Sequence, residues 1–495
     1  MSTIKELKKL AEAENAEAQN ELGCVYRDGD GTRRNYPNAL TQFTKAAQKG
    51  HTKAQVNLGY LYHEGLGTPI DFNQAVYWYR KAAQAGSSMG QYNLAMSYTH
   101  GEGVKRNSRV ALSWIIKAAE VGFVHAQSEL GGWYFKGENV ALDYKLSTYW
   151  YRKAANNGDA ASELCVGYAY LYGLGVRKSY KKCFEWYLKS DSSGYEPAKY
   201  NLALCYEYGT GVKKNLRTAV KWLKKSADAG MDRAQYRLGY AYAEGKGVRK
   251  DLTRAFTWYR QAALQGNSAA QCALANAYLQ GKGISRNKKT AVRWYIKSTL
   301  QSCSDAQYNL AQCYYYGDGV TEDERTAHRW YLKAAKAGDA DAQYAVGRSY
   351  YWGEGVKKDY RLAKKWFEKA AQSGDSKSQY RLACLYADGD GVKEDLKKAF
   401  MLFKQSAEQG NEDAQCSLGY ALHEGEGTQK NFKHAVYWYR KAAHVGDGTA
   451  QSNLGECYRD GEGVPKSKRW AKYWFEKAAA QGDKGAAKEL KKLSE

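Results

Sequence analysis

A stretch of 36 residues recurs along nearly the whole chain, and this period constrains the fold more than any other feature. A small residue opens each copy, first at Ala18 and last at Ala486, and consecutive copies lie 36 residues apart without insertion or deletion. The copy that begins at Ala342 reads AQYAVGRSYYWGEGVKKDYRLAKKWFEKAAQSGDSK. A strict period of this length is typical of stacked repeats that share one continuous core.

The first part of each repeat predicts a helix that ends at a glycine. Leu or Val follows the opening residue after four positions, Gly or Ala after five and, in 12 of 13 repeats, Tyr after eight. These spacings place the residues on one face of a helix. The Gly-x-Gly that comes next, as at Gly353 and Gly355, is expected to end the helix, because Gly adopts positive φ without a Cβ clash.

The second part of each repeat predicts a second helix with its own cap. The second Gly is replaced once, by Asn139, which also tolerates a left-handed backbone. Four residues later every repeat has Asn, Asp or Ser, such as Asp359, a side chain that caps a helix N-terminus. Ala and, in 11 of 13 repeats, Trp follow, as at Ala363 and Trp366. Each repeat is therefore expected to be two helices of roughly 12–14 residues that bury their apolar faces only when stacked.

The repeated pattern A-x-x-x-L-G-x-x-Y-x-x-G-x-G-V-x-x-[DN]-x-x-x-A-x-x-W-[YF]-x-x-A-A-x-x-G closely resembles the Sel1-like repeats, which are relatives of the tetratricopeptide repeats. The resemblance covers the chain from about Asn15 to Leu490. It implies an all-α, right-handed α-solenoid that acts as an adaptor for other proteins. We expect a polar capping helix over residues 1–14, an array of 13 repeats over 15–485 and a second capping helix over 486–495.

Tyrosine suggests where a partner protein binds. By analogy with tetratricopeptide geometry, the first helices line a concave groove, with exposed positions two, six, nine and ten residues after the opening residue. Exposed aromatic side chains with a polar group are favoured interface anchors. We expect them to hold a peptide or helix of another protein, with Asn57, Asn93, Asn201 and Asn309 near the rim; the alternative is that they fill gaps between helices. The predicted groove residues are Tyr200, Tyr208, Tyr236, Tyr240, Tyr308, Tyr315, Tyr316, Tyr344, Arg348, Tyr351, Trp352 and Tyr380.

Basic residues outnumber acidic ones, and the formal net charge is +23. They concentrate between the second Gly and the start of the second helix, and this pattern predicts a basic ridge along one edge of the stack. Two interpretations stay open: the ridge binds nucleic acid or another anionic surface, or it is a solvated face that keeps a Tyr-rich array soluble. The predicted ridge includes Lys213, Lys214, Arg249, Lys250, Lys357, Lys358, Lys364 and Lys365.

No sequence motif indicates catalysis. The Gly-x-Gly copies follow helices and not strands, so they do not predict a dinucleotide site. The eight His show no metal-ligand spacing, and neither H-E-x-x-H, a Walker motif nor G-x-S-x-G occurs. We therefore expect no enzyme, no cofactor and no metal site. The enzymatic alternative is a β-lactam-hydrolysing activity, which the resemblance to the Sel1-like repeat family implies for some members.

The cysteines and the first residues bear on the compartment. None of the ten Cys forms C-x-x-C, and buried free thiols favour a reducing compartment. The opening residues, MSTIKELKKLAEAEN, contain no apolar core of signal-peptide length, and no later run is long enough to span a membrane. We expect a cytoplasmic protein, and export by a dedicated secretion system stays open.

Overall fold

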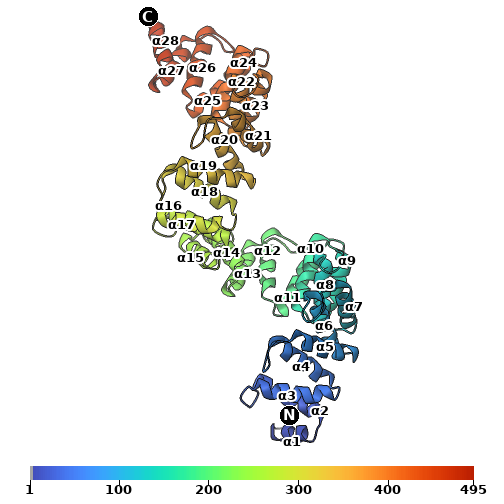
Figure 1. The fold of residues 1–495 in the computed structure, drawn as a ribbon. Coiled ribbons are helices and arrows are strands. Elements are labelled where there is room, and N and C mark those ends of the chain that lie inside the picture. The colour runs from blue at the N-terminus through green and yellow to red at the C-terminus, as the bar shows by residue number, and fades with distance from the viewer. Residues whose placement is uncertain (1–3, 495) are drawn as a thin grey trace. The chain divides into compact units, whose positions relative to one another are not determined.

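The computed structural model describes residues 4–494, which form 28 α-helices and no strand within that range (Figure 1). The chain divides into two compact units, an N-terminal unit up to Lys250 and a C-terminal unit from Asp251. The helices of the N-terminal unit are α1 (Ile4–Glu12), α2 (Ala16–Asp28), α3 (Tyr36–Gln48), α4 (Thr52–Glu64), α5 (Phe72–Gln84), α6 (Ser88–His100), α7 (Ser108–Glu120), α8 (Val124–Lys136), α9 (Tyr144–Asn156), α10 (Ala160–Tyr172), α11 (Tyr180–Ser192), α12 (Pro197–Tyr208), α13 (Leu216–Asp228) and α14 (Asp232–Glu244).

The C-terminal unit continues the same alternation of helices. Its helices are α15 (Leu252–Leu264), α16 (Ser268–Gln280), α17 (Lys288–Thr299), α18 (Ser304–Tyr316), α19 (Glu324–Lys336), α20 (Ala340–Trp352), α21 (Tyr360–Gln372), α22 (Ser376–Asp388), α23 (Leu396–Glu408), α24 (Glu412–Glu424), α25 (Phe432–Val445), α26 (Gly448–Asp460), α27 (Lys468–Ala480) and α28 (Lys484–Ser494). Within each unit every helix packs against the helices before and after it. This arrangement confirms the predicted all-α stack of helix-turn-helix repeats.

We number the repeats 1 to 13 in chain order and call the two helices of each repeat A and B, so that α2 and α3 are the A and B helices of repeat 1. The predicted helix boundaries are confirmed by their caps. Gly353 ends α20 in the left-handed conformation, with a φ of 81°. The side chain of Asp359 accepts a hydrogen bond of 2.9 Å from the backbone N–H of Leu362 at the start of α21. All 13 B helices have a capping side chain of this kind.

The second Gly of each turn has a role that its sequence position alone does not reveal. A Cβ atom on Gly211 would lie 2.0 Å from the carbonyl oxygen of Tyr180, the first residue of the preceding B helix. Gly therefore lets the turn of one repeat rest directly on the start of the B helix before it. The exception, Asn139, has a φ of 63°, and its Oδ1 accepts a hydrogen bond of 3.1 Å from Ser108 at that same place.

Aromatic side chains of the B helices fill the core. The fully buried ring of Phe367 lies against Gly347 of the A helix, where a Cβ would come within 2.6 Å of the ring. Trp366 packs into a cluster of buried residues that joins α19 of repeat 9 to α20 of repeat 10, which confirms the predicted packing role of this Trp between repeats. Other copies, such as Trp330, are only half-buried, and the ammonium group of Lys333 covers the Trp330 ring at 4.0 Å.

A buried Gln directly after the opening residue connects the A helix to the B helix before it. The Nε2 of Gln343 donates a hydrogen bond of 3.3 Å to the carbonyl oxygen of Ala335 in α19. Gln occupies this position in 11 of 13 repeats, and the recurrence was a signal for this role that the spacing argument did not use. Repeat 5 has Glu163 instead, which is buried and forms an ion pair of 3.1 Å with Lys189.

The ten cysteines are free thiols, of which six are buried and four are partly exposed. Cys303 stands out, because it lies at the N-terminus of α18 and packs against the cluster that contains Cys272. A hydrogen bond with the Cys272 thiol, together with the backbone N–H of Ala306, lowers the pKa of Cys303 to about 6. Burial instead raises the pKa of Cys165 to about 11.

We predict that replacing Gly211 by Ala destabilises repeats 5 and 6 more than replacing Gly230 by Ala. Both glycines have positive φ, 73° and 94°, so both substitutions strain the backbone. Only the methyl group at position 211 also meets a carbonyl oxygen, since nothing lies within 4 Å of a Cβ at position 230. The additional loss should be roughly 1–3 kcal/mol, measured by urea unfolding and by hydrogen exchange of the α11 amides. Equal losses would show that this contact does not matter.

We also predict that Cys303 reacts with iodoacetamide before the other partly exposed thiols. The thiolate is the nucleophile, and a folded-state pKa of about 6 leaves Cys303 mostly ionised at neutral pH. Its alkylation rate, followed by peptide mass spectrometry, should rise through pH 6 and then level off, whereas Cys165 should stay slow up to about pH 11. Parallel pH profiles for the two thiols would contradict the assignment.

Candidate protein-binding surface on the A helices

The predicted groove residues lie on the outward face of the A helices, because the opening residue and the Leu or Val four places later point into the core. In α18, Ala306 and Leu310 are completely buried, whereas Tyr316 is 62% exposed. The residues form two separate groups. The repeat 6–7 cluster contains Tyr200, Tyr208, Tyr236 and Tyr240, and the repeat 9–10 cluster contains Tyr315, Tyr316, Tyr351 and Trp352.

The repeat 9–10 cluster consists of two aromatic pairs at the ends of α18 and α20. The rings of Tyr315 and Tyr316 meet edge to face at 4.8 Å, and those of Tyr351 and Trp352 meet in the same way at 4.9 Å. The outer member of each pair is exposed, with 62% for Tyr316 and 45% for Trp352, and the inner member is half-buried. Edge-to-face contact is a favoured geometry for aromatic pairs, so the inner rings support the outer ones.

Two arginines hold these pairs in place. The guanidinium of Arg348 lies 4.3 Å from the centre of the Tyr315 ring, and its Nε donates a hydrogen bond of 2.9 Å to Glu354. The hydroxyl of Tyr315 donates to the same carboxylate at 3.1 Å. Arg381 of α22 lies 4.8 Å from the Trp352 ring. Cation–π contacts and a shared carboxylate therefore connect the A helices of three successive repeats.

Three of the predicted groove residues lie deeper than the pairs. Tyr308, Tyr344 and Tyr380 are half-buried and pack at 5.6, 5.8 and 5.9 Å against aromatic rings of the B helices. Burial raises the pKa of Tyr308 and of Tyr380, so both remain neutral phenols at physiological pH. These tyrosines form the base of the surface, and the paired rings form its outer part.

The repeat 6–7 cluster is organised by one arginine. Arg237 donates to the hydroxyl oxygens of Tyr200 and Tyr208, each at 3.1 Å, and forms an ion pair of 3.1 Å with Glu207. Tyr240 accepts a hydrogen bond of 3.0 Å from Lys246, whose ammonium group also lies over its ring. Polar contacts thus connect α12 to α14 across neighbouring repeats.

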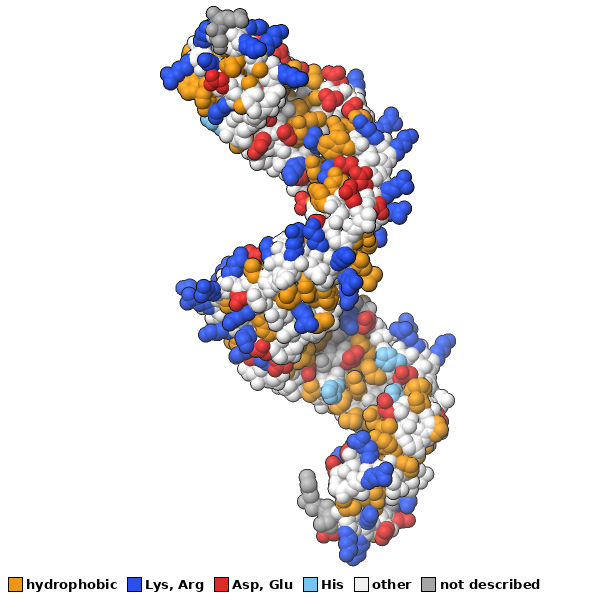
Figure 2. Space-filling model, turned by 90° about the vertical axis from the view of Figure 1, so that its left-hand side faces the viewer, with side chains coloured by type: hydrophobic (Ala, Val, Ile, Leu, Met, Phe, Trp, Pro, Cys, Tyr) orange, Lys and Arg blue, Asp and Glu red, His pale blue; other side chains and the backbone are white. Residues whose placement is uncertain are grey.

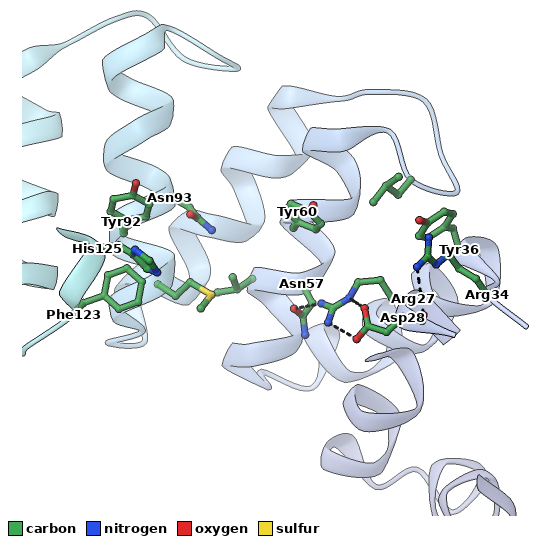
Figure 3. Close-up of a pocket in the computed structure, with 13 residues that line it drawn as sticks. Arg27, Asp28, Arg34, Tyr36, Asn57, Tyr60, Tyr92, Asn93, Phe123 and His125 are labelled. Carbon is green, nitrogen blue, oxygen red and sulfur yellow. Dashed lines mark hydrogen bonds and ion pairs between the residues drawn. The ribbon is translucent and has the colours of Figure 1, made fainter. Parts of the chain in front are cut away.

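A hollow of about 660 Å³ lies on the A-helix face near the N-terminus, and two of the Asn residues predicted near the groove rim, Asn57 and Asn93, line it (Figure 3). Arg27 stands at one side, where it pairs with Asp28 at 2.8 Å and donates to Asn57 at 3.1 Å. Tyr92 and Phe123 lie at the other side with their rings 5.5 Å apart. The hollow thus has a charged wall and an aromatic wall.

The Asn residues expected to hold a partner are partly engaged within the protein. Asn57 Nδ2 donates to Asn20 at 3.0 Å while its Oδ1 accepts from Arg27. Asn309 donates to Asn276 at 3.4 Å. Each of these two side chains connects neighbouring A helices, because its amide group bonds to an Asn of the A helix before it. That they also contact a partner stays a prediction.

The predicted basic residues are mostly exposed. Seven of the eight lie at the surface, in the turns after α12, α14 and α20 and on α21, and Lys364 is half-buried. Lys364 forms an ion pair of 3.3 Å with Glu368, and Lys358 covers the Tyr360 ring at 4.3 Å. Figure 2 shows Lys and Arg side chains in groups on the face that it presents, with apolar patches between them.

The spacing argument missed several residues that shape the surface. Arg237 and Arg381 come three places after the opening residue, the position that Asn57 and Asn309 also occupy, so position was an available signal. The acceptor Glu354 lies in the turn between the two glycines, where the middle residue had no assigned role. Its partner Arg348 lies on the A helix α20, so the contact depends on how the turn folds back toward that helix.

Comparison with known proteins shows which family the chain belongs to. The Sel1 repeat model matches the chain thirteen times, and the chain therefore belongs to the Sel1 repeat family. The matches cover residues 16–51, 52–87, 88–123, 124–159, 158–190, 197–231, 232–267, 268–303, 304–339, 340–375, 376–411, 412–447 and 448–483. The match shortens at 158–190, where Glu163 and Lys189 replace the usual polar contact.

Two solved structures are similar over long stretches. One is c5321, a protective antigen present in uropathogenic Escherichia coli strains that displays an SLR fold; it is 33% identical over 99% of this chain and 97% of its own, with a TM-score of 0.69. The other is a Sel1 repeat protein from Oxalobacter formigenes, 32% identical over 62% of this chain and 89% of its own, with a TM-score of 0.48. The comparison with curated proteins finds no match.

No helix between residues 4 and 494 combines the length and the apolar character that a membrane span needs. The same residues contain no group of three or more His, Cys, Asp or Glu side chains placed to hold a metal ion.

Proposed function

We propose that the protein is a non-catalytic scaffold that binds a peptide or helix of another protein through the repeat 9–10 cluster. Repeat stacks of this family typically serve as protein-interaction scaffolds. The observation that carries the proposal is the pair of exposed rings, Tyr316 and Trp352, each supported by an inner ring. Rigid aromatic side chains with large exposed area are the usual centres of binding energy in interfaces.

The arrangement supports binding because its rings are ordered before a partner arrives. Arg348 and Glu354 fix Tyr315, and Arg381 lies over Trp352, so little conformational freedom remains to be lost on binding. The hydroxyl of Tyr316 and the indole N–H of Trp352 make no hydrogen bond to another described residue. An apolar side chain of the partner can pack on the rings while its backbone carbonyl groups accept these two hydrogen bonds.

The double substitution Tyr316→Ala and Trp352→Ala should weaken binding of the partner by at least ~2 kcal/mol, or roughly 30-fold in Kd, because both anchor rings are lost. Partners would be isolated with the intact chain and then titrated as purified proteins. The matched control is Tyr437→Ala with Tyr473→Ala, which removes two exposed tyrosines from the B helices α25 and α27. This control should bind with unchanged affinity.

Two further variants separate the proposal from its alternatives. Tyr350→Ala should lower stability first, because the Tyr350 ring packs against buried His328 at 5.1 Å. Charge reversal at Lys357, Lys358 and Lys364 should leave partner binding nearly unchanged. If the groove variant binds normally while this charge reversal abolishes binding, the basic residues are the binding surface and the groove assignment is wrong.

A further inference from the structure

Three successive turns of the N-terminal unit concentrate positive charge. The turns at residues 173–178, 209–214 and 245–250 contain no Asp or Glu. Together with the first turns of α11 and α13 they carry ten exposed basic side chains, which we call the basic turn cluster. Its members are Arg177, Lys178, Lys181, Lys182, Lys213, Lys214, Arg217, Lys246, Arg249 and Lys250.

The absence of acidic residues distinguishes these turns from most others in the chain. In repeats 9 and 10 the residue between the two glycines is acidic, and both residues are paired: Asp318 with Lys288 and Glu354 with Arg348. In repeats 5 to 7 the corresponding residues are Leu174, Thr210 and Lys246. None of the ten basic side chains forms an ion pair within the described part of the chain. Their charge is therefore available to an external anion.

Backbone contacts fix the spacing of the cluster. Gly211 rests on the carbonyl oxygen of Tyr180, and a Cβ on Gly247 would lie 2.3 Å from that of Leu216. Each basic turn is thereby held beside the N-terminus of the preceding B helix, whose dipole adds positive potential. The basic turns recur once per two-helix repeat, so their charges form a series along the stack.

Exposed aromatic rings accompany the charges. Five of the chain's 12 exposed tyrosines lie in these three repeats: Tyr168, Tyr172, Tyr180, Tyr208 and Tyr240. Tyr172 and Tyr208, 58% and 62% exposed, come directly before the first glycine of a basic turn. The ammonium group of Lys178 lies 4.8 Å from the Tyr180 ring. Basic groups and exposed rings therefore occur together in these three repeats.

We propose that the basic turn cluster binds single-stranded nucleic acid, with phosphates on the Lys and Arg side chains and bases stacked on Tyr172 and Tyr208. A positively charged track interleaved with exposed rings is the arrangement that binds single strands without sequence preference. An acidic protein segment or an anionic membrane is attracted by the charges, but neither carries bases that stack on the rings. A duplex keeps its bases stacked inside and cannot place them on tyrosines. This activity is independent of the protein-scaffold role.

Fluorescence anisotropy measures binding of the full chain to a labelled mixed-sequence single strand of about 20 nucleotides. The affinity is compared with that for the matching duplex, polyglutamate and phosphatidylserine vesicles. We expect the single strand to bind best. Its affinity should fall steeply with salt, and Lys178→Gln, Lys213→Gln and Lys214→Gln together should reduce the slope of log K against log salt by about 2. Lys357→Gln, Lys358→Gln and Lys364→Gln remove the same charge from the C-terminal unit and should change the affinity less than about twofold.

The rings are tested separately from the charges. Tyr172→Ala with Tyr208→Ala should weaken single-strand binding about tenfold and leave polyglutamate binding unchanged, whereas Phe at both positions should restore binding, because stacking needs the ring and not the hydroxyl. Thermal unfolding of each variant verifies the fold. Any of three results would overturn the proposal. They are polyglutamate or vesicles binding as tightly as the strand, Ala variants that bind normally, and C-terminal control substitutions that weaken binding equally.

Discussion

The contact between a glycine and a carbonyl oxygen is the constraint on which the stack depends. The second Gly of a turn lies so close to the start of the preceding B helix that no Cβ fits, as Gly211 and Tyr180 show. The contact fixes where the turn of one repeat lies on the B helix of the repeat before it. Where Gly is missing, Asn139 makes a hydrogen bond to Ser108 at the same place, so the connection persists through a side chain.

This fixed register explains why equivalent positions of successive repeats meet. Gln343 of repeat 10 reaches the carbonyl of Ala335 in repeat 9, and Trp366 packs into a cluster that includes α19 of repeat 9. Phe367 covers Gly347 within repeat 10. The outward positions of the A helices and turns take no part in these contacts, so they are free to carry other residues. The two proposed surfaces use that freedom differently, one with braced aromatic pairs and one with unpaired charge beside exposed rings.

The recurring positions were predictable from the sequence because a repeated packing role leaves a periodic signal. The caps at Asp359 and its equivalents, the left-handed glycines and the Trp between repeats were all expected and are confirmed. The contacts of Arg237 and Arg381 were not expected, because these contacts depend on side chains about 30 residues away, although the two Arg share one position of the repeat. The sequence likewise did not reveal that the side-chain oxygen of Asn57 accepts a hydrogen bond from Arg27.

The aromatic surface is the central claim, and site-specific photo-crosslinking tests it most directly. A photoreactive phenylalanine analogue placed at Tyr316 should crosslink to the bound partner with high yield, because this ring stands at the exposed end of α18. The same analogue at Tyr437 on α25, which is also exposed, should give little crosslinking. Efficient crosslinking from position 437 together with none from position 316 would contradict the account.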